Sequence, residues 1–278
     1  MTTPYDGRIL WWHWKGSAVS AERIDELAAL VKTETPNAAG IALKTSNGRQ
    51  WQGEYDDPNA ALAISGPESI ARWVETLNRH GLETHLWCVV HGRDVDAEAE
   101  RIIEACHVPG VHSMILDVEA GERYFGSQPP ATARALITRV RRAIPADFHL
   151  GLCAFVGGDE LETIHIDEWL PHVQSLHPMI YHWDFSQGTS GPRPYIDDAF
   201  ARLAPYARPV APILQTYADP HTGQPVPGEH IIEAGQYAFE RGAAGISFFR
   251  LGHADDTSGP EQFAAVRRIE PRRPYSEA

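Results

Sequence analysis

Two carboxylates, Asp117 and Glu119, stand two residues apart directly after the apolar run Met114–Leu116. Such a run is typical of a buried β-strand, and strand side chains alternate between two faces, so both acids are expected to point to one side. Burying carboxylates is costly unless they are paired or hydrogen-bonded. The pair therefore either binds loop amides and serves the fold, or serves a site, as acids at the end of a barrel strand usually do.

The chemistry that such a pair suits is cleavage of a glycosidic bond. This reaction needs a proton donor to the leaving oxygen and a negative group that balances the developing oxocarbenium ion. Glu119 is the candidate donor, and the neighbouring charge of Asp117 would raise its pKa. Both acids come from one strand, too close for an inverting pair with a water between them, which needs about 6.5–9.5 Å. An acetamido group of the substrate would replace a second nucleophilic carboxylate.

Further polar and aromatic residues lie near the ends of the other apolar runs. Flat aromatic rings suit the C–H faces of sugars, and a ring with a polar edge suits a wet cleft. Each residue alone is more often a packing or capping residue, and some of the tryptophans could simply fill the interior, so the prediction depends on their convergence. The candidates for substrate binding are His13, Trp14, Lys44, Trp51, Trp87, His182, Trp183, Asp184, Gln215, Tyr217 and Arg250.

The elements that must position these residues are eight short apolar runs that alternate with amphipathic segments. The runs are Arg8–Trp14, Gly40–Lys44, Glu83–Val90, Ser113–Glu119, His149–Phe155, Ser175–Trp183, Pro209–Tyr217 and Ala244–Arg250. Between them, apolar residues recur at helical spacing, as at Ile24, Leu27, Ala28 and Val31. Strand–helix alternation predicts parallel strands, and eight units predict one (β/α)8 TIM barrel over residues 1–270, followed by a polar C-terminal tail, 271–278.

The runner-up fold is an open, doubly wound sheet. That fold predicts a glycine-rich phosphate turn after the first strand, where this chain has His13-Trp14-Lys15-Gly16-Ser17. The barrel is therefore favoured. Its active face is expected where the long segments that follow the apolar runs gather. One of these segments, Thr45–Ile64, carries Trp51 and Tyr55, which favours a functional loop.

Composition limits the partners. The 278 residues include 24 basic and 37 acidic side chains, a net charge of −13. The sequence has no basic stripe, which argues against nucleic acid, and an acidic surface disfavours anionic membranes. No apolar stretch reaches the ~18 residues of a membrane span, and no secretory signal is visible, so a cytoplasmic protein is expected. The cysteines are expected to be buried free thiols in a reducing compartment; they are Cys88, Cys106 and Cys153.

The pattern Leu116-Asp117-Val118-Glu119, together with Met179-Ile180-Tyr181 near the end of a later run, resembles glycoside hydrolase families 18 and 25. These are barrels that cleave N-acetylhexosamine polymers, the chitinases and the muramidase-type lysozymes. The resemblance implies that Glu119 is the general acid, that Asp117 orients or stabilises the acetamido group, and that Tyr181 hydrogen-bonds that group. It implies a carbohydrate ligand and no cofactor or metal, and leaves open whether the chain forms an oligomer.

The chain also departs from these families. His112 and Ile115 stand where the chitinase signature has two further aspartates, and His182 follows Tyr181 where family 18 has Asp or Asn. Trp12-His13-Trp14 stands where the muramidases carry an aspartate near the end of the first strand. Both families usually act outside the cell, so a bacterial intracellular sugar hydrolase or a lysin released by a phage would fit the lack of an export signal.

Two other function classes stay open at this stage. One is a non-catalytic carbohydrate-binding protein on a glycosidase scaffold, because fold does not imply function. The other is a metal-dependent hydrolase or isomerase barrel, in which nitrogen and oxygen ligands would come from His13, His91, Asp117, Glu119 and His182.

Overall fold

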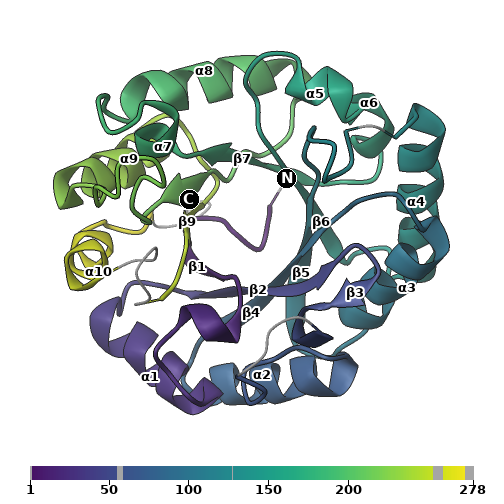
Figure 1. Ribbon diagram of the computed structural model, residues 1–278, viewed down its shortest axis with the longest axis horizontal. Helices are drawn as coiled ribbons and strands as arrows, with labels where there is room; N and C mark the ends of the chain where they lie inside the picture. The colour runs from purple at the N-terminus through teal and green to yellow at the C-terminus, as the bar shows by residue number, and fades with distance from the viewer. Residues whose placement is uncertain (1, 55–58, 127, 253–258, 273–278) are drawn as a thin grey trace, which may run out of the picture.

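The computed structural model describes residues 2–54, 59–126, 128–252 and 259–272. Within these residues, eight parallel strands close into a barrel, because β1 pairs with both β2 and β9 (Figure 1). The barrel strands are β1 (Ile9–His13), β2 (Gly40–Asn47), β4 (Glu83–Val89), β5 (Val111–Asp117), β6 (His149–Ala154), β7 (Ser175–Ile180), β8 (Ile213–Gln215) and β9 (Ile246–Phe249). The predicted (β/α)8 barrel is confirmed.

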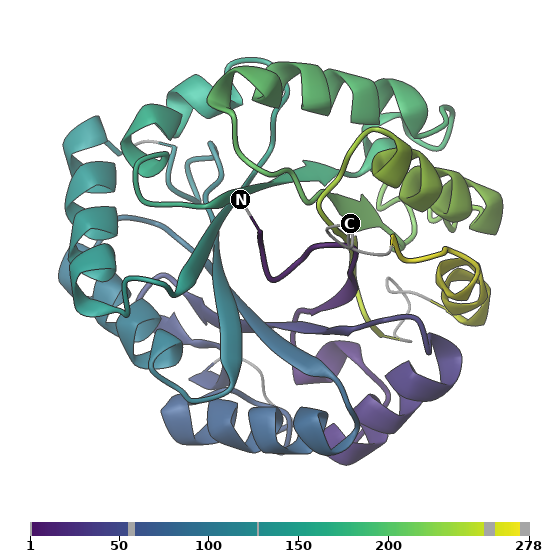
Figure 2. The ribbon, with the colours of Figure 1, turned by 180° about the vertical axis from the view of Figure 1, so that it is seen from behind.

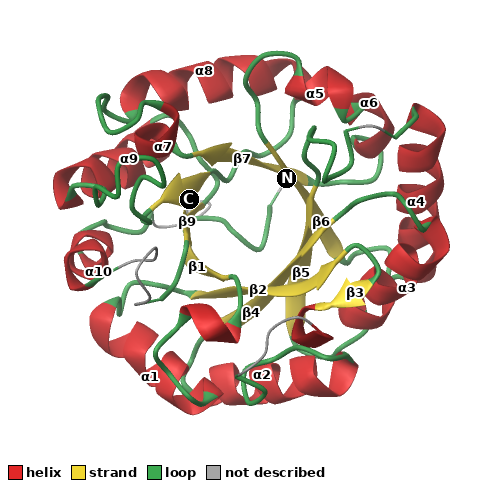
Figure 3. Ribbon diagram, in the orientation of Figure 1, coloured by secondary structure: helices red, strands yellow, loops and turns green. Residues whose placement is uncertain are grey.

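Helices surround the strands as an outer ring (Figure 3). They are α1 (Ile24–Glu34), α2 (Pro67–Arg79), α3 (Val95–Cys106), α4 (Pro130–Ala143), α5 (Glu160–Thr163), α6 (Ile166–Trp169), α7 (His182–Phe185), α8 (Arg193–Leu203), α9 (Gly228–Glu240) and α10 (Pro260–Arg267), with 3-10 turns η1 (Gly16–Ala18), η2 (Gln52–Glu54) and η3 (Ala204–Tyr206). None of the described helices is long and apolar enough to span a membrane. The three cysteines are buried and form no disulfide, as expected.

Strand alternation divides the apolar residues into two cores. In β1, Ile9 and Trp11 belong to the core between strands and helices, whereas Leu10 and Trp12 belong to the barrel interior. A residue's position in its strand thus decides whether it faces the helices or the interior. In β5 the interior positions are every second residue, Ser113, Ile115 and Asp117.

Two segments differ from the sequence prediction. The run that was expected to end at Trp183 ends as β7 at Ile180, because Tyr181 leaves the extended conformation and α7 begins with His182. The expected loop Thr45–Ile64 begins as strand instead. β2 continues to Asn47 and turns back into the two-residue antiparallel strand β3 (Gln50–Trp51) through Gly48, whose positive φ suits glycine. Tyr55 and residues 273–278 of the predicted tail lie outside the described residues.

The N-terminal segment closes one end of the barrel, and Figures 1 and 2 both show it inside the ring of strands. The Tyr5 hydroxyl donates to Ser113 Oγ at 2.7 Å, and Tyr5's ring contacts His149 and His177 at centroid distances of 5.2 and 4.6 Å. His85 Nδ1 lies 2.8 Å from the same Ser113 oxygen. Burial lowers the pKa of His149 to about 4 and that of His177 to about 3, so these imidazoles are neutral in the folded protein.

This histidine layer predicts acid sensitivity. A histidine whose pKa is lower in the folded than in the unfolded protein contributes its full stability above the unfolded pKa. This contribution is lost as the pH falls from the unfolded pKa towards the folded pKa. His177→Gln removes one such group and keeps a polar partner for Ser175, so the loss of unfolding free energy between about pH 7 and pH 4 should shrink by about 1 kcal/mol or more. Urea denaturation at several pH values measures this loss. His107→Gln, at an exposed site, is the control. The same pH dependence in both variants would contradict the prediction.

Candidate active site

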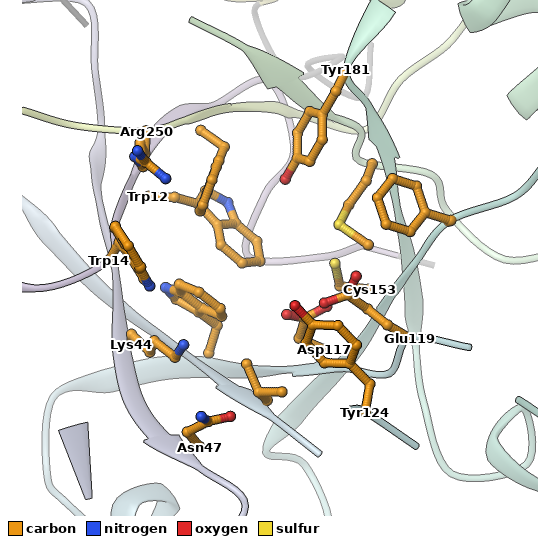
Figure 4. A pocket seen from close by; sticks show the side chains of 15 residues that line it. Trp12, Trp14, Lys44, Asn47, Asp117, Glu119, Tyr124, Cys153, Tyr181 and Arg250 are labelled. Atoms are coloured by element: carbon orange, nitrogen blue, oxygen red, sulfur yellow. The ribbon is translucent and has the colours of Figure 1, made fainter. Parts of the chain in front are cut away.

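A cavity of about 410 Å³ opens at the carboxyl ends of the barrel strands, the face where barrel enzymes carry their active sites. It is lined by Trp12, Trp14, Lys44, Asn47, Trp87, Val89, Asp117, Glu119, Tyr124, Cys153, Phe155, Met179, Tyr181, Phe249 and Arg250. Figure 4 shows the two carboxylates side by side on one wall, with Lys44, Trp14 and Arg250 on the opposite wall.

The backbone that carries the two acids is fixed on both sides. Asp117 is the last residue of β5, and its carbonyl accepts from Val90 N–H at 2.9 Å, while Val118 N–H donates to the Cys153 carbonyl at 2.9 Å. The sequence suggested that Glu119 ends the strand, but β5 ends at Asp117 and Glu119 lies on the loop that follows. Its carbonyl accepts from two later backbone N–H groups at 3.1 and 3.0 Å, which closes a tight loop. The acids are therefore held by the sheet and by a loop that folds back on itself.

Glycine is required where this loop closes. Gly126 N–H is one of the two donors to the Glu119 carbonyl. A Cβ atom at Gly126 would collide with the backbone of Ala120. A larger residue at position 126 would thus displace the loop that holds Glu119.

The surroundings of the two carboxyl groups shift their pKa values by different amounts. Asp117 is 5% exposed, and burial raises its pKa, although the Cys153 thiol that donates to it and the Lys44 ammonium partly offset this. Burial raises the pKa of Glu119, and the charge of Asp117 raises it further. We conclude that Asp117 is the more acidic group and that Glu119 keeps its proton at neutral pH.

Lys44 faces this pair from β2. Burial lowers the pKa of its ammonium group to about 8, an effect that the negative charges of Asp117 and Glu119 oppose. Its Nζ atom lies 4.9 Å from the centroid of the Trp87 ring. The cavity thus holds a cation whose charge can balance that of Asp117.

Two indole rings are locked in the cavity floor. Trp12 and Trp87 contact each other at a centroid distance of 4.8 Å. Trp12 Nε1 donates to Ser247 Oγ at 2.8 Å and Trp87 Nε1 donates to the His13 carbonyl at 3.1 Å. Because both ring N–H groups are used in this way, the rings present apolar surface to a ligand at little cost in side-chain entropy.

Tyr181 follows β7 and completes the wall. Its ring stacks on Phe249 at 5.6 Å and meets Tyr217 edge-on at 5.5 Å. Figure 4 shows its hydroxyl directed into the cavity. Burial raises the pKa of Tyr181, so the phenol stays neutral and can donate a hydrogen bond.

The structure brings together half of the residues that the sequence singled out. Those that line the cavity are Glu119, Asp117, Tyr181, Trp14, Lys44, Trp87 and Arg250. Those that do not line it are His13, Trp51, His182, Trp183, Asp184, Gln215 and Tyr217.

Strand alternation and the early end of β7 explain most of the second group. His13 shares the strand face of Trp11 and lies 5.0 Å from Trp73 of the helix layer. The helical turn of α7 directs His182 and Trp183 towards His230, at 5.6 and 5.2 Å.

Gln215, Asp184 and Tyr217 form a hydrogen-bonded support behind the cavity. The Gln215 side chain accepts from the backbone N–H groups of Trp183 and Asp184 at 3.1 and 3.0 Å. The Tyr217 hydroxyl donates to Asp184 Oδ2 at 2.9 Å, and Trp51 packs in the outer core. Gln215, and Tyr217 through Asp184, orient the segment that follows Tyr181.

Several lining residues were not among the candidates. Trp12, Cys153 and Phe249 lie on interior strand positions, and Phe155 continues the alternation one residue past the end of β6, so strict counting of alternation could have found them. Asn47 could not be found in this way, because the register of β2 shifts between Lys44 and Ser46.

The metal-site alternative does not agree with the structure. Among the described residues, the His, Cys, Asp and Glu side chains close enough to share an ion are Asp184, Asp219 and His221. The ligand set considered from the sequence, which included His13 and His182, does not converge.

The closed eight-stranded barrel is the architecture that this chain shares with solved glycoside hydrolases. No protein-family model matches the sequence, and no curated protein sequence matches it either. The similar solved structures include an endo-1,4-beta-D-mannanase from Thermotoga petrophila (TM-score 0.61, 10% identity, covering 94% of this chain and 98% of that one).

Two further structures share the fold. One is a GH113 beta-mannanase from Alicyclobacillus acidocaldarius (TM-score 0.59, 13% identity, 95% of this chain and 96% of that one). The other is a GH18 chitinase from Pseudoalteromonas aurantia (TM-score 0.54, 11% identity, 88% of this chain and 94% of that one). At this identity the similarity shows the fold, and function has to be argued from the site.

The raised pKa of Glu119 has a consequence for stability. A carboxyl group with a raised folded pKa costs no stability below its unfolded pKa, and the cost grows as the pH rises towards the folded value. Glu119→Gln should therefore raise the melting temperature by about 2–4 °C or more near pH 8, with a smaller gain near pH 5. Thermal unfolding of Glu119→Gln and of the exposed-site control Glu122→Gln tests this. A gain that does not vary with pH would be inconsistent with a buried protonated Glu119.

Proposed function

We propose that this protein is a glycoside hydrolase that cleaves an N-acetylhexosamine-containing glycan with retention of configuration, and that Glu119 is its general acid. The observation that carries the proposal is the placement of Glu119 and Asp117 side by side in one aromatic cavity, in an environment that keeps Glu119 protonated. The barrel architecture shared with mannanases and a chitinase agrees with it.

In the first step, Glu119 protonates the oxygen that links the leaving sugar, and the bond from this oxygen to the anomeric carbon breaks. Loss of this proton leaves two adjacent negative charges, Asp117 and Glu119, facing a positive sugar ring. The two negative charges stabilise the oxocarbenium ion, and this attraction exists only while the positive charge is present. An interaction made only in the transition state accelerates the reaction. As the leaving group departs, the carbonyl oxygen of the substrate's acetamido group bonds to the anomeric carbon. Water then attacks the anomeric carbon, the bond to the acetamido oxygen breaks, and Glu119 takes a proton from the water as general base.

The acetamido group of the substrate supplies the nucleophile in this proposal. Among the described residues that line the cavity, the acids are Asp117 and Glu119, so the cavity offers no third carboxylate for a covalent intermediate. Asp117, buried at the end of β5, would accept the acetamido N–H, and the Tyr181 hydroxyl would donate to its carbonyl oxygen. The neutral phenol and the ionised carboxylate are the protonation states that this orientation needs.

Glu119→Gln tests the proposal. The amide keeps the shape of the side chain but has no proton to donate, so the rate of hydrolysis of N-acetylglucosamine oligomers should fall by about 10²–10⁴-fold. Product formation followed by chromatography measures the rate, and circular dichroism confirms the fold. Glu122→Gln in the same loop is the control and should retain activity.

Two outcomes would contradict the proposal. Full activity of Glu119→Gln would remove Glu119 from the chemistry. Binding of oligomers by the unaltered protein without hydrolysis over long incubation would instead identify a non-catalytic carbohydrate-binding protein on this scaffold.

A further inference from the structure

A second cavity of about 410 Å³ adjoins the first, and the two share Phe155 and Met179 as a common wall. It lies between the loop after β6 and helices α7 and α8. Its lining residues outside that shared wall are Val156, Gly157, Gly158, Asp159, Glu160, Ile180, Phe185, Tyr195, Asp198 and Ala199. The candidate active site described above uses none of these.

A continuous series of aromatic rings leads from one cavity to the other. Tyr181 meets Phe155 at 6.1 Å, Phe155 meets Phe185 at 5.4 Å, and Phe185 meets Tyr195 at 6.1 Å. Phe185 is 44% exposed, whereas the other large apolar side chains of the described chain are more covered. Its backbone N–H donates to the Tyr181 carbonyl at 2.9 Å, and its ring lies 6.0 Å from the Tyr181 ring. An aromatic ring held in water beside a cavity is a surface that a sugar ring can cover.

Glu119 lies towards the boundary between the two cavities. It lines the first cavity and follows β5, which pairs with β6, and the loop after β6 carries Phe155 and Glu160 into the lining of the second cavity. A proton donor stands beside the bond that breaks, between the sugar that reacts and the group that leaves. With the reacting sugar over Asp117 in the first cavity, the leaving group extends towards the second.

We infer that the second cavity binds the leaving-group part of the glycan, so that the substrate is an oligosaccharide with at least one sugar beyond the cleaved bond. This inference rests on the proposed function. The acids Asp159, Glu160 and Asp198 line the cavity, and one cation, Arg202, pairs with Asp198 at 2.7 Å. The excess of negative charge selects sugars that are uncharged or carry an amino group and disfavours uronates.

Kinetics with two substrates that differ in their leaving group test this inference. Phe185→Ala and Tyr195→Ala should each lower kcat/KM for N-acetylglucosamine tetramers by about three- to ten-fold, the loss of one aromatic contact. Chitobiosyl fluoride has a single-atom leaving group that cannot reach the second cavity, so its kcat/KM should change less than about two-fold. Tyr206→Ala, a half-buried tyrosine of η3 that lines neither cavity, is the matched control.

Binding to the Glu119→Gln protein provides a readout that does not need turnover. Adding Phe185→Ala to that protein should weaken binding of the tetramer and leave binding of free N-acetylglucosamine unchanged. A tetrasaccharide of alternating glucuronate and N-acetylglucosamine should bind about ten-fold more weakly than the N-acetylglucosamine tetramer.

The failures of the two proposals are distinguishable. Equal effects of Phe185→Ala and Tyr195→Ala on the tetramer and the fluoride, or equal binding of the uronate and the neutral tetramer, would overturn the inference and leave Glu119 as the acid. Full activity of Glu119→Gln would overturn the proposed function itself.

Discussion

The site depends on one constraint: two carboxyl groups are buried close enough for the charge of one to raise the pKa of the other. Asp117 and Glu119 cannot both ionise cheaply, because each is removed from water and faces the other. The Cys153 thiol and the Lys44 ammonium favour the charge on Asp117, which leaves the proton on Glu119. The difference in role between two similar side chains therefore comes from their neighbours, and the barrel is the scaffold that holds those neighbours in place.

The same alternation that builds the barrel selects the members of the site. Every second residue of a strand faces the interior, so each strand end can deliver an interior residue to one shared face. Lys44, Trp87, Asp117 and Cys153 reach the cavity in this way from four consecutive strands of the barrel. The aromatic rings that line the cavity surround the acids with apolar surface, which strengthens the electrostatic interactions on which the acids depend.

The barrel and the position of the cavity's two acids could be predicted from the sequence. The eight apolar runs identified the barrel, and Asp117 and Glu119 identified the face that carries the cavity. What the sequence could not supply was the point where each strand ends. A strand that stops at Ile180 turns His182 and Trp183 outwards, and a register shift after Lys44 brings Asn47 inwards. Such changes depend on packing and on backbone geometry rather than on local composition.

The histidine layer that contains Tyr5 also depends on contacts between the N-terminal segment and the segment that leads into β9. Gly7 N–H donates to the Ala244 carbonyl at 2.6 Å, and Ile246 N–H donates to the Arg8 carbonyl at 3.0 Å. A Cβ atom at Gly245 would collide with the Tyr5 carbonyl, so the two segments approach as closely as backbone allows. Tyr5 can thus take its place only after β9 exists. On the ribosome, the barrel would stay unsealed until β9 has emerged from the exit tunnel.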